Sequence, residues 1–214
     1  MPRQKLNRYD RINNDPRVVN GLEHPHELFV DEKKQYNSII LELACGRGEY
    51  SVWLAHHFPD RLFVGIDAKG DRIGVWLDHV HQAWLKNVRF VCGIIHHIDR
   101  WFLPESVDEI WIVHPDPRPR DRDIKRRLTH PRFLELYDRI LKPWWLLKLK
   151  TDDKDLFIYS LEQLSSSPRD YVYTSTDLHR NPTALQDHYG IQTHYEKLAL
   201  AEGKQICYGV WRKR

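Results

Sequence analysis

The fold is decided by residues 38–50, which read SIILELACGRGEY. The first six of these are apolar or β-branched apart from Ser38 and Glu42, and such a continuous run is typical of a parallel strand buried on both faces. Gly46 and Gly48 come next, and residues 49–57 carry apolar side chains at helical spacing. The stretch therefore predicts a buried strand that enters a helix through a glycine turn.

The rest of the chain repeats this alternation. Further strands are expected at RLFVGID, NVRFVC, VDEIWIV, WWLLKLK, DYVYTST and QICYGVW, which start at residues 61, 87, 107, 144, 170 and 205. Helices are expected near residues 26–35, 71–85, 131–142, 151–164 and 195–201, with Thr129 or His130 capping the third and Thr151 or Asp152 capping the fourth. Strands alternating with helices predict an α/β fold with a doubly wound, mostly parallel seven-stranded sheet, whose ligands bind at the carboxyl ends of the strands.

Length and composition indicate one domain. A chain of 214 residues can bury one substantial core, and residues 21–214 are expected to form it. Residues 1–20 are polar and rich in Arg, Asn and Asp without apolar periodicity, so we expect a flexible basic and polar arm there.

Several classes of protein do not fit the composition. No stretch of the sequence approaches the roughly 20 apolar residues of a membrane span, and the first residues lack the apolar core of a signal peptide. The three cysteines are far apart and form no Cys-x-x-Cys pair, and the paired histidines are adjacent, so their side chains diverge. We expect a cytoplasmic protein that binds no metal.

Four residues around the glycine turn indicate the bound cofactor. Gly46 and Gly48 let the backbone approach a ligand closely, and Asp67, at the end of the second strand, suits the two hydroxyls of an adenosine ribose. The third glycine of a dinucleotide-binding fingerprint is absent, because Ser51 stands in its place. Glu42 would repel a pyrophosphate but attract the amino group and sulfonium of S-adenosylmethionine. These residues favour S-adenosylmethionine over NAD, with a plain tight turn as the alternative.

A second acidic position follows the fourth strand. The sequence HPDPRP holds Asp116 between two prolines, which would fix one carboxylate at the active edge of the sheet, although a turn aspartate that caps its own backbone is an equal alternative. The run RPRDRDIKRR, residues 118–127, sets six cations against two acids. Cations on a loop beside a cofactor site can clamp phosphates, so this run favours a nucleic-acid substrate.

Longer motifs resemble a known family. They are LELACGRGE, FVGIDAKGDRI, PDPRPRDRDIKRRLTHPRFLELYDRILKP, KTDDKDLFIYSLEQL, TDLH and THYEK, which lie between residues 41 and 197. This sequence resembles the bacterial tRNA (guanine-N7)-methyltransferases, from about residue 39 to residue 208. The resemblance implies a Rossmann-like class I methyltransferase fold, S-adenosylmethionine as methyl donor and guanosine 46 of the tRNA variable loop as target.

The resemblance also implies residue roles. Glu42, Gly46, Gly48 and Asp67 would bind S-adenosylmethionine, and Asp116 would contact the cofactor and act in catalysis. The positions expected to bind guanosine are Arg120, Asp152, Thr193, His194, Tyr195 and Glu196, and those expected to contact RNA are Arg122, Lys125, Arg126 and Arg127.

The chain departs from the family pattern at several places. Ile94 and Ile95 follow Gly93 where the family often has an acid near the adenine, and Arg118 replaces the usual Trp. His114 stands where an aromatic residue is usual, and Trp144 and Trp145 replace two glycines.

The chemistry of guanine N7 needs few catalytic groups. N7 carries a lone pair and no proton, so a general base has nothing to remove. We expect alignment to give most of the acceleration, with Asp116 orienting the base and stabilising its developing positive charge. Two alternatives remain, a tRNA-binding relative with impaired or no activity and a methyltransferase for another substrate. A monomer and a homodimer are both compatible with the sequence.

Overall fold

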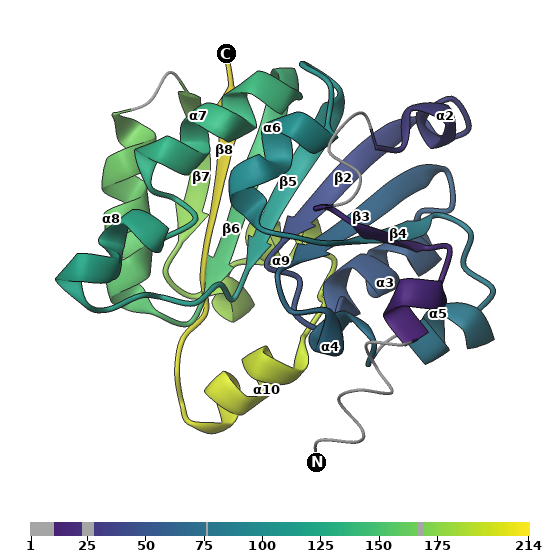
Figure 1. Ribbon diagram of the computed structural model, residues 1–214. Coiled ribbons are helices and arrows are strands. Elements are labelled where there is room, and N and C mark those ends of the chain that lie inside the picture. Colours follow the sequence, from purple (N-terminus) through teal and green to yellow (C-terminus); the bar gives the residue numbers. More distant parts are fainter. Residues whose placement is uncertain (1–10, 23–27, 76, 167–168) are drawn as a thin grey trace.

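Eight strands form one sheet in the computed structural model, which describes residues 11–22, 28–75, 77–166 and 169–214 (Figure 1). The strands are β1 Val18–Asn20, β2 Ser38–Leu43, β3 Arg61–Asp67, β4 Val88–Cys92, β5 Val107–Val113, β6 Leu141–Thr151, β7 Arg169–Ser175 and β8 Cys207–Lys213. Their order is β1-β4-β3-β2-β5-β6-β8-β7, and neighbours pair in parallel except at β8, which is antiparallel to β6 and β7. The predicted doubly wound, mostly parallel α/β class is confirmed, with one strand more than the seven expected.

The helices lie on both faces of this sheet. They are α2 Val30–Lys33, α3 Glu49–His57, α4 Gly70–Ile73, α5 Leu77–Gln82, α6 Ile98–Trp101, α7 Pro131–Ile140, α8 Lys154–Ser165, α9 Pro182–Asp187 and α10 His194–Ala201, with 3₁₀ helices η1 Ile95–His97, η2 Asp121–Arg126 and η3 Leu178–Arg180. Side chains of α6, α7 and α8 belong to one buried cluster, and those of α3, α5, α9 and α10 belong to another. None of the helices in the described part of the chain is both long and apolar enough to cross a membrane.

Alternation along β2 explains how one strand serves both layers. Ile39, Leu41 and Leu43 are buried in the α6–α8 cluster, whereas Ile40 is buried in the cluster on the α3 face. Burial of each such aliphatic side chain contributes about 1.5–3 kcal/mol. Glu42 shares the face of Ile40, because successive side chains of a strand point to opposite sides. The strand thus brings its one acid to the α3 side of the sheet.

The structure differs from the sequence predictions at several element boundaries. Residues 11–20 of the expected arm pack on the domain, because residues 11–14 are helical, Ile12 is buried and β1 pairs with β4. Residues 1–10 of that arm lie outside the described residues. The helix expected over residues 71–85 is replaced by α4 and α5, and Gly74 caps the end of α4.

The caps of two helices decide where functional side chains point. His130 caps α7 as predicted, since its side chain accepts the N–H of Arg132. For α8 the prediction is wrong by one residue, because Asp153 caps the helix by accepting the N–H of Leu156 at 2.7 Å. Asp152 is therefore not used as a cap, and its carboxylate can make other contacts.

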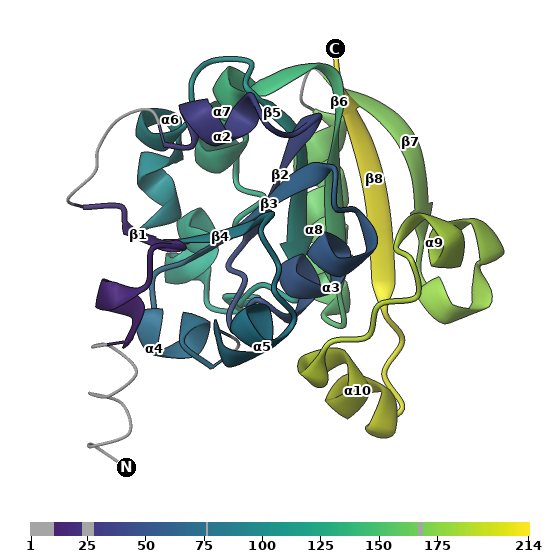
Figure 2. The same ribbon diagram turned by 90° about the vertical axis from the view of Figure 1, so that its right-hand side faces the viewer.

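Helix α10 lies beyond the two helical layers. Figures 1 and 2 both show it below the carboxyl ends of the parallel strands, where the loops that follow these strands also gather. This edge of the sheet and α10 enclose the candidate site.

Candidate active site

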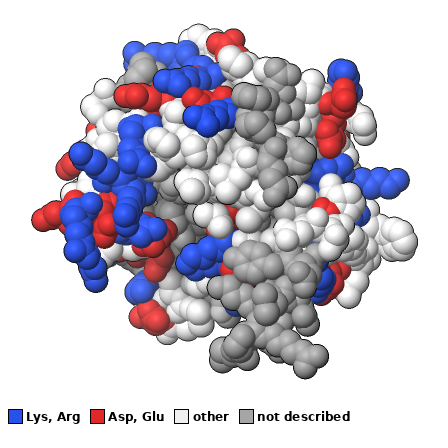
Figure 3. All heavy atoms as spheres, in the orientation of Figure 1, with Lys and Arg blue, Asp and Glu red and all other residues white. Residues whose placement is uncertain are grey.

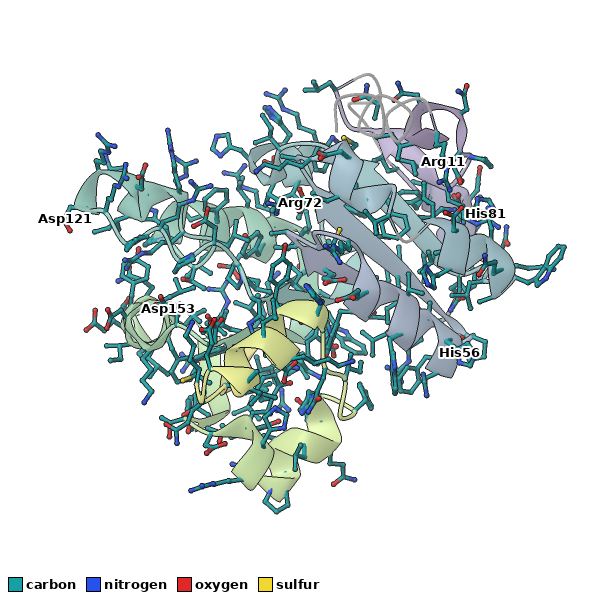
Figure 4. The ribbon with its side chains drawn as sticks, turned by 90° about the horizontal axis from the view of Figure 1, so that it is seen from below. Arg11, His56, Arg72, His81, Asp121 and Asp153 are labelled. Atoms are coloured by element: carbon teal, nitrogen blue, oxygen red, sulfur yellow. The ribbon has the colours of Figure 1, made fainter. Side chains whose placement is uncertain are left out.

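A cavity of about 750 Å³ opens at the carboxyl ends of the parallel strands. It is lined by the loops that follow β2, β3, β4, β5 and β6 and by residues of α10. Figure 4 looks onto this edge, with Arg72 of the cavity wall near the middle, Asp153 of the same wall to the left and Asp121 farther out on that side, at the beginning of η2. The volume of the cavity suits a ligand the size of a nucleoside derivative.

The glycine turn shapes one wall of the cavity. Gly46 and Gly48 have φ values of 56° and 79°, in the left-handed region that favours glycine. A Cβ at Gly48 would lie 2.5 Å from the ring of Phe90, whereas a Cβ at Gly46 would meet nothing within 4 Å. Gly46 lines the cavity and Gly48 does not. Gly48 is therefore needed for packing, and Gly46 leaves space for a ligand.

Asp67 is held beside this turn by two backbone bonds. Its Oδ2 accepts the N–H of Gly46 at 2.9 Å and its Oδ1 accepts the N–H of Lys69 at 2.8 Å. The side chain is nearly buried yet lines the cavity. It is thus a fixed acceptor at the end of β3, as the ribose-binding prediction requires.

Glu42 lies deeper in the same wall. Its Oε2 accepts the N–H and the hydroxyl of Ser51, at 2.8 Å and 2.6 Å. Burial raises the pKa of Glu42 to about 7, because these two hydrogen bonds only partly offset desolvation. No cation among the described residues compensates its charge. A buried carboxylate in this state would be stabilised by a cationic ligand.

The loop after β5 presents Asp116 to the cavity. Its Oδ1 accepts the N–H of Arg118 at 3.2 Å, and its Oδ2 lies 3.3 Å from the guanidinium of Arg118. Asp116 therefore caps its own turn and also lines the cavity, so the two alternatives for this residue are compatible. His114 and Arg118, on either side of it, have positive φ values of 46° and 50°.

His114 and Asp152, from the loops after β5 and β6, form another part of the cavity wall. The Nδ1 atom of His114 lies 3.1 Å from Oδ1 of Asp152, and both residues line the cavity. This hydrogen bond, aided by the charge of the imidazole, lowers the pKa of Asp152 to about 2, although burial opposes the change. Asp152 is therefore an ionised acceptor at the site.

Helix α10 contributes only part of the predicted guanosine-binding segment. Thr193 caps the helix and lines the cavity with Tyr195. The backbone N–H of His194 donates to Glu49 at 2.7 Å, which joins α10 to the start of α3. Glu196 is fully buried and does not line the cavity. The structure thus places Glu196 beneath the cavity surface.

Glu196 is instead the centre of an ion-pair network. Lys150 Nζ lies 2.6 Å from its Oε2, and His179 Nε2 lies 2.9 Å from its Oε1. Burial would raise the pKa of Glu196, but His114 and Lys150 together lower it to about 2. Lys150 was assigned no role in the sequence analysis, although a lysine in the apolar strand LLKLK indicates a buried, charged partner.

The basic loop lies at the outer rim of the cavity. Figure 3 shows Lys and Arg gathered on the side where Figure 1 places the segment between β5 and α7. Arg120, Arg122 and Lys125 are exposed, and the exposed Arg126 also lines the cavity. Asp123 neutralises part of this charge, since its carboxylate lies 3.1 Å from Arg126.

Arg127 does not belong to this exposed surface, contrary to the prediction that it contacts RNA. It is buried, its guanidinium donates to the carbonyl groups of Pro117 and Arg118, and it stacks on Tyr159. These bonds fix the loop around Asp116.

The unusual residues have different positions. Ile94 is half-exposed and lines the cavity where the family often has an acid. Trp144 and Trp145 are exposed near the beginning of β6 and do not line the cavity. They therefore do not narrow it. Among the described residues, no three His, Cys, Asp or Glu side chains are grouped as metal ligands would be.

Comparisons with known proteins give a consistent result. A family model described as "Putative methyltransferase" matches residues 36–208. The chain is 37% identical over 203 residues to the tRNA (guanine-N(7)-)-methyltransferase of Cytophaga hutchinsonii, covering 87% of this chain and 91% of the relative. It is 36% identical over 200 residues to the protein of the same name from Bacteroides fragilis, covering 94% of this chain and 76% of the relative.

Solved structures support the fold alone. The 16S rRNA methyltransferase KamB superposes with a TM-score of 0.66 at 12% identity, covering 86% of this chain and 92% of that one. A variant of the 16S rRNA (adenine(1408)-N(1))-methyltransferase from Catenulisporales acidiphilia, solved with its cosubstrate SAM, superposes with a TM-score of 0.58 at 13% identity, covering 86% of this chain and 89% of that one.

Proposed function

Because the chain belongs to the family of tRNA (guanine-N7)-methyltransferases, we propose that it transfers the methyl group of S-adenosylmethionine to N7 of guanosine 46 in tRNA. One observation carries the proposal. A single cavity joins the buried, uncompensated carboxylate of Glu42 to Asp116 and Asp152, with Arg126 at its rim. A cationic methyl donor matches Glu42, and a purine base that becomes positively charged on methylation matches Asp116 and Asp152. The phosphates of an RNA backbone match Arg126 at the rim.

The residues present fit S-adenosylmethionine. Glu42 has the charge and burial to bind the ammonium group, and Asp67 is positioned to accept hydrogen bonds from ribose hydroxyls. The open space at Gly46 allows close approach of the backbone, and Gly48 keeps the turn in its left-handed conformation. When bound, this cofactor supplies a methyl group on a positively charged sulfur.

The protein's part in the reaction is orientation and electrostatic stabilisation. Guanine N7 needs no deprotonation, so Asp116 and Asp152 serve as acceptors for the amide and amino edge of the base. Their negative charge also stabilises the positive charge that develops on the purine. Thr193 and Tyr195 complete the wall on the α10 side, and His194 anchors that helix through Glu49.

The basic rim is proposed to hold the RNA. Arg120 would contact the target nucleotide, and Arg122, Lys125 and Arg126 would contact phosphates nearby. Glu196 and Arg127 support these surfaces from below rather than touch the substrate. A tRNA substrate implies that the enzyme acts in the cytoplasm.

The decisive experiment measures methyl transfer from labelled S-adenosylmethionine to unmodified tRNA, followed by nucleoside analysis. Appearance of 7-methylguanosine, and its loss when guanosine 46 is replaced by adenosine, would support the proposal. An Asp116→Ala enzyme that turned over at the wild-type rate would contradict the role of Asp116. Methylation at another atom would contradict the N7 assignment.

Ile94 in the cavity favours one alternative, a tRNA-binding relative with an impaired donor pocket. Calorimetry separates the two functions. Saturable binding of S-adenosylmethionine excludes a defective donor pocket, whereas tRNA binding without donor binding would favour the inactive relative.

A further inference from the structure

His114 occupies a constrained position directly after β5. Its φ of 46° lies in the left-handed region, and its N–H donates to the carbonyl of Lys150 at 2.8 Å. Its side chain is only 5% exposed. Histidine is one of the residue types that adopt this backbone conformation most readily, and here the hydrogen bond to Lys150 anchors the backbone beside β6 while the ring is buried.

The ring lies between two carboxylates from different elements. Its Nδ1 is 3.1 Å from Oδ1 of Asp152, in the loop directly after β6, and its Nε2 is 3.9 Å from Oε2 of Glu196, on α10. Nε2 is buried and has no hydrogen-bond partner among the described residues. Only the doubly protonated imidazolium presents N–H groups to both carboxylates, because a neutral ring has one acceptor nitrogen.

The other charged groups around the ring do not prevent His114 from being protonated. Lys150 pairs with Glu196 and opposes a second positive charge, while Lys204 lies 3.4 Å from the far oxygen of Asp152. His179 contacts the other oxygen of Glu196, Oε1, at 2.9 Å. Burial also disfavours the charged ring, but the two carboxylates outweigh these effects and raise the pKa of His114.

We propose that His114 is a positioning residue for the guanosine substrate: its imidazolium ties Asp152 to Glu196 and so joins the loop after β6 to α10. His114 holds Asp152 through Oδ1, and the carboxylate, whose Oδ2 lies 3.4 Å from the exposed Lys204, is thereby oriented where it lines the cavity. This inference rests on the proposed function, because Asp152 and the α10 wall are its proposed guanosine-binding groups.

Loss of the proton has a defined consequence. A neutral ring turns an acceptor nitrogen toward one carboxylate, and two lone pairs then face each other. The clamp is therefore intact below the pKa of His114 and weakens as the pH rises through it. The KM for tRNA should rise by roughly tenfold across this step, since a charge-assisted hydrogen bond is lost, while kcat changes less.

The test compares the pH dependence of tRNA methylation in the wild type and three variants at saturating S-adenosylmethionine. At saturating S-adenosylmethionine the donor site stays occupied at every pH, so ionisation of Glu42 does not change the KM for tRNA. His114→Phe fills the site without a charge and should give a raised KM that no longer depends on this titration. His114→Gln keeps one donor and should recover part of the affinity without recovering the pH dependence.

The matched control is His81→Gln, which removes another His–carboxylate pair. His81 Nε2 lies 2.5 Å from Asp15, His81 does not line the cavity, and Figure 4 shows it on the far side from Asp153. This variant should keep the wild-type KM profile. A wild-type profile in His114→Phe, or a loss of kcat at constant KM, would overturn the proposal.

A second readout does not depend on tRNA. Nuclear magnetic resonance of the imidazole should give a pKa for His114 above that of an exposed histidine, and Asp152→Asn should lower it. An unchanged His114 pKa in Asp152→Asn would overturn the clamp. If the wild type methylates no tRNA, the proposed function fails, and this titration decides the clamp by itself.

Discussion

Glu42 is a carboxylate that the fold buries without an ion-pair partner among the described residues. Its pKa of about 7 means that the unfolded chain releases this proton at lower pH than the folded protein does. Folding stability is therefore unaffected below the unfolded pKa and falls as the pH rises from about 4.5 to about 7. The charged form of Glu42 is retained at the expense of stability, as expected for a group that binds a cation.

Glu42→Gln should stabilise the protein at pH 8 by about 3 kcal/mol, and by little at pH 5, because the amide is never charged. Denaturant unfolding at the two pH values measures this difference. The same variant should bind S-adenosylmethionine more weakly at pH 8 in calorimetry. Glu162→Gln, which changes an exposed glutamate on α8, should show neither effect, and an equal response of the two variants would contradict the assignment.

Gly46 and Gly48 share a backbone conformation but differ in their surroundings. Gly48→Ala should lower the free energy of unfolding by about 2–4 kcal/mol, because left-handed strain adds to the contact with Phe90. Gly46→Ala should cost about 1 kcal/mol in stability from strain, yet weaken binding of S-adenosylmethionine, since its methyl group would extend into unoccupied space. Unfolding and calorimetry on both variants test the distinction. Equal stability losses would refute it.

At the scale of elements, β6 has a strained irregularity near its beginning, where its pairing with β5 shifts register. Trp144 has a φ of 69° and is largely exposed, whereas Trp145 has no positive φ. The resemblance to a family with glycine at these positions agrees with this geometry, because glycine adopts positive φ without a steric penalty.

Trp144→Gly should therefore raise the free energy of unfolding by about 1 kcal/mol, and methyl transfer should stay at the wild-type rate because the cavity is elsewhere. Trp145→Gly is the matched control. It removes a strand-forming side chain and should destabilise by about 0.5–1 kcal/mol. In thermal unfolding, the Tm should rise for Trp144→Gly and fall for Trp145→Gly. Changes of Tm in the same direction would contradict the assignment of backbone strain to Trp144.

In the basic loop, residues 118–127, the cations from Arg120 onward fall into two groups: exposed ones proposed to contact RNA, and the buried Arg127, which stabilises the loop. Arg122→Ala combined with Lys125→Ala should leave stability unchanged and reduce the salt dependence of tRNA binding, by roughly 0.7–0.9 in log–log slope for each lost phosphate contact. Arg127→Ala should instead lower stability by about 1–3 kcal/mol, since the carbonyl groups of Pro117 and Arg118 lose a charged donor. Binding at several salt concentrations, with unfolding measurements, separates the two. An unchanged slope in the double variant would argue for a smaller substrate.

Over the whole molecule, the sequence predicted what depends on local pattern. All seven expected strands are present, because each is an apolar run ended by turn residues. Strand β1 was missed, since three residues in a polar segment carry no such signal. The motif residues Glu42, Asp67 and Asp116 meet in one cavity because parallel strands end at the same edge.

The remaining errors concern partners that are distant in sequence. Glu196 can be buried because it forms an ion pair with Lys150, and Arg127 because it donates to the carbonyl groups of Pro117 and Arg118. Neither contact can be predicted from the spacing of residues along the sequence. The role of His114 was hidden for the same reason, because Asp152 and Glu196 come from separate elements.

The place of β8 between β6 and β7 has a consequence for synthesis of the protein. β8 is the last strand that the structure describes, yet it pairs on both sides. Among the described strands β7 pairs with β8 alone, so this pairing waits until residues 207–213 have left the ribosome. The glycine turn, by contrast, needs only β2 and its neighbours β3 and β5, all of which are synthesised before residue 114. The glycine turn therefore leaves the ribosome long before α10 and β8, and the cavity that these elements complete can assemble only after translation has passed β8.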